Sequence, residues 1–169
     1  FRVLYPVHPD KNEYYLQDAL ACGWPTLIME PRRLYEVEEL NYRVWPQPDV
    51  YLITFGDVVL DAVSAASELE GVGIKAQVHP IEDLKAMPLP KDNIPAVVID
   101  TGHLYFGATA EVMARLNEQG NTKTNRLGPP FTALPTSVKL EQEWYPNTSR
   151  ILTAVNKLLD IQLPLPEMA

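Results

Sequence analysis

The sequence predicts an α/β fold, a three-layer α/β/α arrangement with a mostly parallel or mixed sheet. Short apolar runs alternate with helix-like segments along the chain, as in successive βαβ units. The run 96–100, Ala-Val-Val-Ile-Asp, is continuous and rich in β-branched residues, which is typical of a parallel strand buried on both faces. The 169 residues are 46% hydrophobic and 21% charged, the balance of an ordinary globular chain.

The first 35 residues have the pattern of one βαβ unit. The runs 2–5 and 26–30 are short, apolar and closed by proline, and we expect both to be strands. Between them, Asp10 is the predicted N-cap of a helix that ends near residue 21, before Gly23. Three apolar residues of this helix are spaced for one face: Tyr14, Leu16 and Leu20.

An acidic and proline-containing stretch separates this unit from the rest. Residues 36–49 hold three glutamates, two prolines and Trp45, so we interpret them as an extended linker with the indole as its docking side chain. The predicted organisation is therefore a first piece over 1–35, a linker over 36–49, an α/β domain over 50–162 and a tail over 163–169.

The domain itself follows the βαβ pattern more clearly. We expect strands over 50–55, 74–79 and 96–100, helices over 58–69, 108–119 and 150–159, and an extended or strand-like segment over 127–136. Asn147 or Thr148 is the expected N-cap of the last helix.

Charge and motif content exclude several classes of function. The chain has 14 basic and 22 acidic residues, a net charge of −8, which argues against nucleic acid as a main partner and against a polybasic membrane-surface role. No apolar run approaches the roughly 20 residues of a membrane span. The single cysteine, Cys22, excludes an intramolecular disulfide; its place at a helix end predicts a raised pKa and an inert thiol. No metal site is predicted, because no histidine pair or His/Asp/Glu cluster has ligand spacing.

We expect a reducing, cytoplasmic location, or an organelle matrix in a eukaryote. The chain starts at Phe1 and not at a methionine, so we expect it to begin after processing or inside a longer polypeptide.

Three loops are candidate sites, because ligands of open α/β sheets bind beyond the carboxyl ends of the strands. Arg32, with Arg33 beside it, suits a carboxylate or phosphate; the alternative is a salt bridge to the nearby glutamates. Gly56 and Asp57 lie at the start of a predicted helix. In one interpretation the backbone N–H groups of this helix start bind an anion. In the other, Gly56 forms a tight turn and Asp57 caps the helix.

His103 lies in a loop with Gly102 and Gly107, after the strand 96–100 and before a helix. It is a candidate acid, base or anion donor; the alternative is an imidazole bonded to backbone at an interface.

Several stretches, in order, resemble the carboxyl-terminal domain of transketolase-like thiamine-diphosphate enzymes, and most of all the β subunit of 2-oxo acid dehydrogenase E1 components. The run 52–76 resembles the family's strand, glycine turn, helix and "E-L…G-I-x-A-x-V" return strand, and 81–88 resembles its "I-x-x-L-K-P" continuation. The run 97–112 resembles "V-V-x-x-E-x-x-x-x-G-G-x-x-x-E-V", and 126–147 resembles the "R-x-G" to "L-E…P" segment before the last helix. Residues 1–35 resemble the end of the family's pyrimidine-binding domain.

The resemblance implies oxidative decarboxylation of a 2-oxo acid on thiamine diphosphate and Mg²⁺, with acyl transfer to lipoamide. It also implies an E1 α-type partner subunit or upstream domain, a homodimer or heterotetramer, and contact with a lipoyl-bearing E2. The family's catalytic Glu and pyrimidine pocket lie before residue 1, and its G-D-G…N motif is absent from the chain. We therefore expect no cofactor on this chain alone, a role for His103 near the active-site entrance, and no activity of the isolated chain.

The chain departs from the family pattern at three places. Asp100-Thr101 displaces the customary acid, Phe106-Gly107 replaces the doubled glycine, and Pro130 stands near the customary Asp. Arg32 occupies the place of a substrate-phosphate arginine in sugar-phosphate relatives, which keeps a transketolase or 1-deoxyxylulose-phosphate synthase type open. A stand-alone binding or assembly module is the third alternative.

Overall fold

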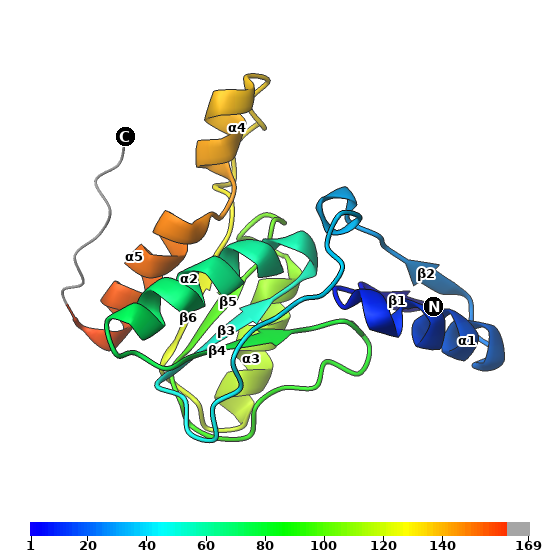
Figure 1. Ribbon diagram of the computed structural model, residues 1–169, viewed down its shortest axis with the longest axis horizontal. Helices are drawn as coiled ribbons and strands as arrows, with labels where there is room; N and C mark the ends of the chain where they lie inside the picture. The colour runs from blue at the N-terminus through cyan, green and yellow to red at the C-terminus, as the bar shows by residue number, and fades with distance from the viewer. Residues whose placement is uncertain (162–169) are drawn as a thin grey trace.

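The computed structural model describes residues 1–161 and has the predicted three layers (Figure 1). Its central sheet has four parallel strands in the order β4-β3-β5-β6. The strands are β3 (Val50–Thr54), β4 (Ala76–Pro80), β5 (Ala96–Ile99) and β6 (Thr124–Leu127). Helices α2 (Val59–Gly71) and α5 (Thr148–Leu159) cover one face, and α3 (Ala108–Glu118) covers the other. The predicted tail over 163–169 lies outside the described residues.

Strand alternation divides the core into two clusters, one on each face of the sheet. Leu52 of β3 packs with α2 and α5, whereas Ile53 packs with α3. Both side chains are fully buried, and all four residues of β5 are buried too. This is the burial of a central parallel strand, and it explains why the sequence of β5 is apolar on both faces.

The amino-terminal unit forms a small separate sheet. Strands β1 (Arg2–Leu4) and β2 (Thr26–Ile28) pair in parallel, joined by the 3₁₀ turn η1 (Pro9–Lys11) and α1 (Asn12–Ala21). The predicted cap is wrong: Asp10 lies inside η1, and Lys11 is the residue that precedes α1. The predicted apolar face of this helix is exposed in the structure, because α1 has no buried residue.

Two features of the carboxyl-terminal third differ from expectation. The strand-like segment predicted over 127–136 is instead β6, which ends at Leu127; its sequence Thr-Asn-Arg-Leu is largely polar because it is an edge strand. The helix α4 (Val138–Trp144) was not predicted, since none of its residues is buried and no apolar periodicity reveals it. Asn147 is the cap of α5, as expected: its side chain accepts a hydrogen bond from the Arg150 N–H at 3.0 Å.

An acidic pair after β4 holds the amino-terminal unit against the domain. The buried Glu82 carboxylate accepts hydrogen bonds at 2.9 Å from the Val7 N–H, the His8 ring and the Tyr15 hydroxyl. Burial by itself would raise the pKa of Glu82, but the hydrogen bonds from His8 and Val7 and the charges of His8 and Lys11 outweigh it and hold the pKa at about 2. These hydrogen bonds hold residues 1–35 against the domain that contains β4.

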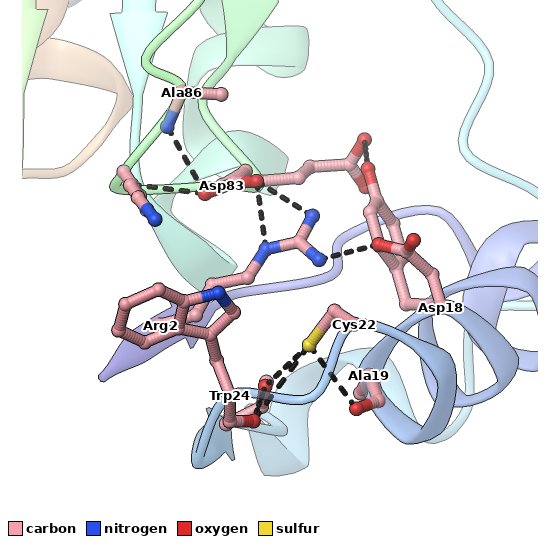
Figure 2. A network of polar contacts seen from close by, with 11 residues as sticks. Arg2, Asp18, Ala19, Cys22, Trp24, Asp83 and Ala86 are labelled. Carbon is pink, nitrogen blue, oxygen red and sulfur yellow. Dashed lines mark hydrogen bonds and ion pairs between the residues drawn. The ribbon is translucent and has the colours of Figure 1, made fainter.

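The neighbouring Asp83 continues this contact (Figure 2). Its carboxylate accepts two hydrogen bonds from the Arg2 guanidinium, at 2.7 and 3.0 Å, and the same guanidinium pairs with Asp18 of α1. Cys22 lies beside this network, and its pKa is lowered and not raised as expected, through hydrogen bonding to the Trp24 backbone and then to the Thr26 hydroxyl.

Candidate functional site

The loops after β3 and β5 diverge at the carboxyl edge of the sheet and leave a crevice between them. From β3 the chain passes through α2 to β4 on one side, and from β5 it passes through α3 to β6 on the other. This reversal of strand order is the point at which open α/β sheets bind ligands. The turn at Gly56-Asp57 and the loop 101–107 therefore stand where a site is expected.

A cavity of about 600 Å³ occupies this crevice. The short 3₁₀ turn η2 (Arg32–Leu34) of the amino-terminal unit supplies Arg33, whose Nη1 lies 3.0 Å from Asp61 Oδ2 and 3.7 Å from Asp57 Oδ2. The opposite wall comes from the loop after β5 and from the segment that joins α4 to α5. The lining residues with side chains able to contact a ligand include Arg33, Asp57, Asp61, Thr101, Glu141 and Tyr145.

Gly56, which precedes the cavity residue Asp57, makes an unusually close contact. Its φ is +58°, in the left-handed region that favours glycine, and a Cβ built there would lie 2.3 Å from the Tyr5 ring. The Tyr5 ring belongs to the amino-terminal unit. Burial, followed by the charges of Asp57 and Asp100, raises the pKa of Tyr5, so its hydroxyl is neutral.

Asp100 directly follows β5 and packs against the loop 101–107. Burial raises the pKa of its carboxyl group, against the opposing hydrogen bonds from the backbone N–H groups of Gly102 and Thr101. A Cβ added at Gly102 would lie 2.9 Å from Asp100 Oδ2, so the loop closes tightly over this side chain. The carboxyl stabilises the loop that carries His103.

His103 lies in an aromatic cluster with Phe131 and Trp144. Its exposed ring meets Phe131 edge-on at a centroid distance of 5.3 Å and Trp144 at 5.8 Å. Beside this cluster runs a second groove, of about 440 Å³, whose walls are mainly apolar. The groove is lined by Leu104, Gly128, Pro130, Pro135, Leu140 and Trp144, together with Glu143 and Arg150.

The structure does not bring the sequence-predicted residues into one site. Asp57 lines the cavity, and Gly56 precedes it in the turn after β3 without lining the cavity. Arg32 is exposed and makes no ion pair within residues 1–161, whereas its neighbour Arg33 takes the position on the cavity. His103 stands apart in the aromatic cluster.

Sequence reasoning missed several of the cavity's residues. Asp61 lies one helical turn after Asp57, and this i,i+4 spacing at a helix start was a usable signal. No local pattern could have placed Glu141 and Tyr145 there, because the arm between β6 and α5 carries them to the cavity.

The charges of the cavity determine what it can accommodate. The cavity is lined by three carboxylates, those of Asp57, Asp61 and Glu141, and by a single guanidinium, that of Arg33, so the surroundings repel a phosphate or diphosphate and favour hydroxyl or ammonium groups. Across residues 1–161 no group of three or more His, Cys, Asp or Glu side chains is placed to hold a metal ion. In the same range no helix has the length and apolar character needed to cross a bilayer.

Comparison with known proteins gives consistent matches. The model of the family described as "Transketolase, C-terminal domain" matches residues 39–151. The chain is 28% identical to the pyruvate dehydrogenase E1 component subunit beta of Bacillus subtilis, over 94% of this chain and 56% of that protein. It is 28% identical to the 3-methyl-2-oxobutanoate dehydrogenase subunit beta of Mycobacterium tuberculosis, over 94% and 52%.

A solved structure shares the fold. It is described as "Split gene transketolase, inactive beta4 tetramer" and superposes with a TM-score of 0.69 at 21% identity, covering 96% of this chain and 58% of its own. The chain spans about half the length of the curated relatives it matches.

Proposed function

The chain belongs to the transketolase C-terminal domain family, and from this membership we propose that it is the carboxyl-terminal portion of an E1 β-type subunit of a 2-oxo acid dehydrogenase. The observation that carries the proposal is the match of 94% of the chain to β subunits of pyruvate and 3-methyl-2-oxobutanoate dehydrogenases. The reaction is the oxidative decarboxylation of a 2-oxo acid with acyl transfer to lipoamide. Thiamine diphosphate, when bound to the intact enzyme with Mg²⁺, supplies the carbanion chemistry.

In this proposal the chain contributes to assembly and to the active-site entrance, and it is inactive alone. The crevice does not fit the cofactor's diphosphate, because three carboxylates and one guanidinium line it and two of the carboxylates already pair with that guanidinium. The cofactor is then held by an α-type subunit or an upstream domain. The complete assembly is a homodimer or heterotetramer in the cytoplasm or an organelle matrix, and it transfers its acyl group to a lipoyl-bearing E2.

Residues 1–35 are the end of a second, pyrimidine-binding-type domain in this proposal, and residues 36–49 are the linker. Two observations support it. A parallel sheet of only two strands is exceptional, since parallel sheets are normally larger and covered on both faces. In addition, α1 and its surroundings expose Leu16, Leu20 and Trp24 to the extent of 53%, 78% and 60%, as expected of a surface that packs against further structure.

His103 is the residue of this chain that we place near the entrance for substrate. It is exposed, lies at the carboxyl edge of the sheet and is oriented by two aromatic rings. An imidazole held in this way has a free edge for a hydrogen bond to an incoming carboxylate or carbonyl. It acts by binding and orienting, and the cofactor performs the bond cleavage.

The test begins with the native protein. Intact-mass measurement of the polypeptide from its source should give a mass well above 19.0 kDa, and the purified assembly should oxidatively decarboxylate pyruvate or 3-methyl-2-oxobutanoate. In that assembly, His103→Ala should raise KM for the 2-oxo acid several-fold. The control His79→Ala should not, since His79 bonds the Pro88 carbonyl at the end of β4. A native mass near 19.0 kDa without 2-oxo acid turnover would contradict the proposal.

A ketol transfer on phosphorylated sugars is the second candidate, and one observation favours it. The Arg32 guanidinium is exposed and makes no ion pair with any residue in 1–161, so it is available to a phosphate. Turnover that depends on phosphorylated sugars and is lost in Arg32→Ala would support this candidate. Unchanged turnover in that variant would dismiss it.

A further inference from the structure

Arg150, near the start of α5, is a cation without an acidic partner. Its guanidinium donates hydrogen bonds to the Trp144 carbonyl oxygen at 2.6 Å and to the Gly128 carbonyl oxygen at 3.0 Å. Arg150 forms no ion pair with another residue of 1–161. These bonds use two of the five N–H groups of the guanidinium, and the others have no partner in that range. The guanidinium therefore retains the capacity to bind a carboxylate.

The surroundings of this guanidinium are mainly apolar. Arg150 lines the groove of about 440 Å³, a size usual for small-molecule pockets, which span about 300–1,000 Å³. The apolar side chains of the walls are Leu104, Pro130, Pro135, Leu140 and Trp144. The Arg150 side chain is half-buried, and burial lowers its pKa. A positive charge that is partly withdrawn from water beside apolar walls is stabilised when an anion binds to it.

One carboxylate lines the same groove. Glu143 of α4 is exposed and forms no ion pair with Arg150 or with any other residue that the structure describes. It precedes Trp144, whose carbonyl oxygen accepts the hydrogen bond from the guanidinium, so the acidic residue lies near the basic one. The groove thus presents one cation and one anion that do not neutralise each other. In the crevice, by contrast, the guanidinium is already paired with two carboxylates.

We propose that this groove is a binding site for a free α-amino acid with an apolar side chain, such as leucine. The carboxylate of the amino acid binds the Arg150 guanidinium, and its ammonium group binds the Glu143 carboxylate. The apolar side chain lies against Leu140 and Trp144. Both charges and the apolar body of the ligand then meet a complementary part of the groove.

Ligands that lack one of these three parts fit less well. A carboxylic acid without an ammonium group is repelled by Glu143, and an amine without a carboxylate is repelled by Arg150. Glycine leaves the apolar walls in contact with water. The site lies outside the crevice, goes beyond the proposed function and requires no part of that reaction.

The experiment is isothermal titration calorimetry on the full native polypeptide with any co-purifying subunits present. Leucine should bind saturably, with a Kd of about 1 mM or lower. Three related compounds are titrated in parallel: 4-methylpentanoate, which lacks the ammonium group, leucinamide, which lacks the carboxylate, and glycine, which lacks the side chain. The first two should bind about tenfold more weakly than leucine, because each loses a hydrogen bond between charged groups. Glycine should also bind more weakly than leucine.

Variants at two exposed positions locate the binding site. Arg150 also holds two backbone carbonyls, so Glu143 and Leu140 are changed instead, and unfolding temperatures are compared with the wild type. Glu143→Gln should weaken leucine binding about tenfold and leave 4-methylpentanoate binding undiminished, because only leucine uses the negative charge. Leu140→Asp should weaken the binding of both. Glu118→Gln is the matched control: Glu118 is exposed at the end of α3, outside the groove, and leucine should bind this variant as it binds the wild type.

Three results would overturn the proposal. The first is the lack of saturable binding of leucine, valine and phenylalanine to the native protein. The second is equal affinity for leucine and 4-methylpentanoate, which would show that the ammonium group is not recognised. The third is leucine binding that is unchanged in both Glu143→Gln and Leu140→Asp, which would place the ligand elsewhere. The readout is binding, so failure of the proposed reaction and failure of this site are distinguishable.

Discussion

Gly56 links the two parts of the molecule through the absence of a side chain. Its left-handed backbone lets the chain turn from β3 into α2, and its bare Cα allows the Tyr5 ring to lie directly on it. The sequence predicted the tight turn from the glycine alone. The contact with Tyr5 could not be predicted from neighbouring residues, because 51 positions separate Tyr5 from Gly56 in the sequence (56 − 5).

Substitution at Gly56 should therefore cost more than its backbone angle implies. Gly56→Ala should lower the free energy of unfolding by about 3 kcal/mol or more, from about 1–2 kcal/mol of left-handed strain and a collision with the Tyr5 ring. Gly23→Ala is the matched control: its φ is +70° and the space around it is open, so only the strain applies. Urea unfolding of the two variants measures the difference. Equal losses would show that the Tyr5 ring moves aside freely.

At the scale of helices and strands, the apolar pattern of the sequence predicts the elements that bury an apolar face and misses those that do not. The strands β3 and β5 and the helices α2, α3 and α5 bury apolar faces, and each was predicted close to its true bounds. The edge strand β6 and the helix α4 bury none of their residues fully, so they leave no periodic signal. The apolar spacing of α1 was recognised, and the structure shows that these side chains are exposed in this chain.

The contact between the amino-terminal unit and the domain depends on Glu82. Its pKa is about 2 in the folded protein against an ordinary value near 4.5, so its ionised form stabilises the fold at neutral pH by about 3 kcal/mol. This stabilisation is fully present above about pH 4.5 and is lost as the pH falls toward 2. Glu82→Gln should remove it, because the amide cannot accept every hydrogen bond that Val7, His8 and Tyr15 donate.

Urea unfolding at several pH values checks this expectation. The wild type should exceed Glu82→Gln in stability most at pH 7, and the gap should shrink steadily below pH 4.5. Glu111→Gln serves as the control, since the exposed Glu111 pairs with Arg115 one turn along α3 and makes no contact with residues 1–35 among those that the structure describes. A gap that is constant from pH 7 to pH 3 would mean that the charge of Glu82 is not the source of the stability.

For the whole molecule, the sequence predicted the layers better than the site. The α/β/α architecture follows from alternating segments, each readable within about 15 residues. The crevice, in contrast, joins Arg33 from the first unit, Asp57 and Asp61 from α2's start, and Glu141 from the arm. The fold brings these residues together from distant parts of the sequence, so only those that follow a predicted strand were named as candidates. The sequence indicated Arg32 as the anion-binding candidate, whereas the turn η2 directs its neighbour Arg33 to the cavity.

The unequal burial of the two parts predicts unequal stability. No side chain of α1 is buried and β1 pairs with β2 over only three residues, whereas β3 and β5 are enclosed on both faces. Native-state hydrogen exchange should therefore show α1 amides opening at a free energy at least ~3 kcal/mol below that of β3 and β5 amides. Glu82→Gln should widen this gap, since it weakens the contact that holds residues 1–35. Equal protection of α1 and β3 would instead show that both parts unfold as one cooperative unit, and that residues 1–35 need no further structure to be stable.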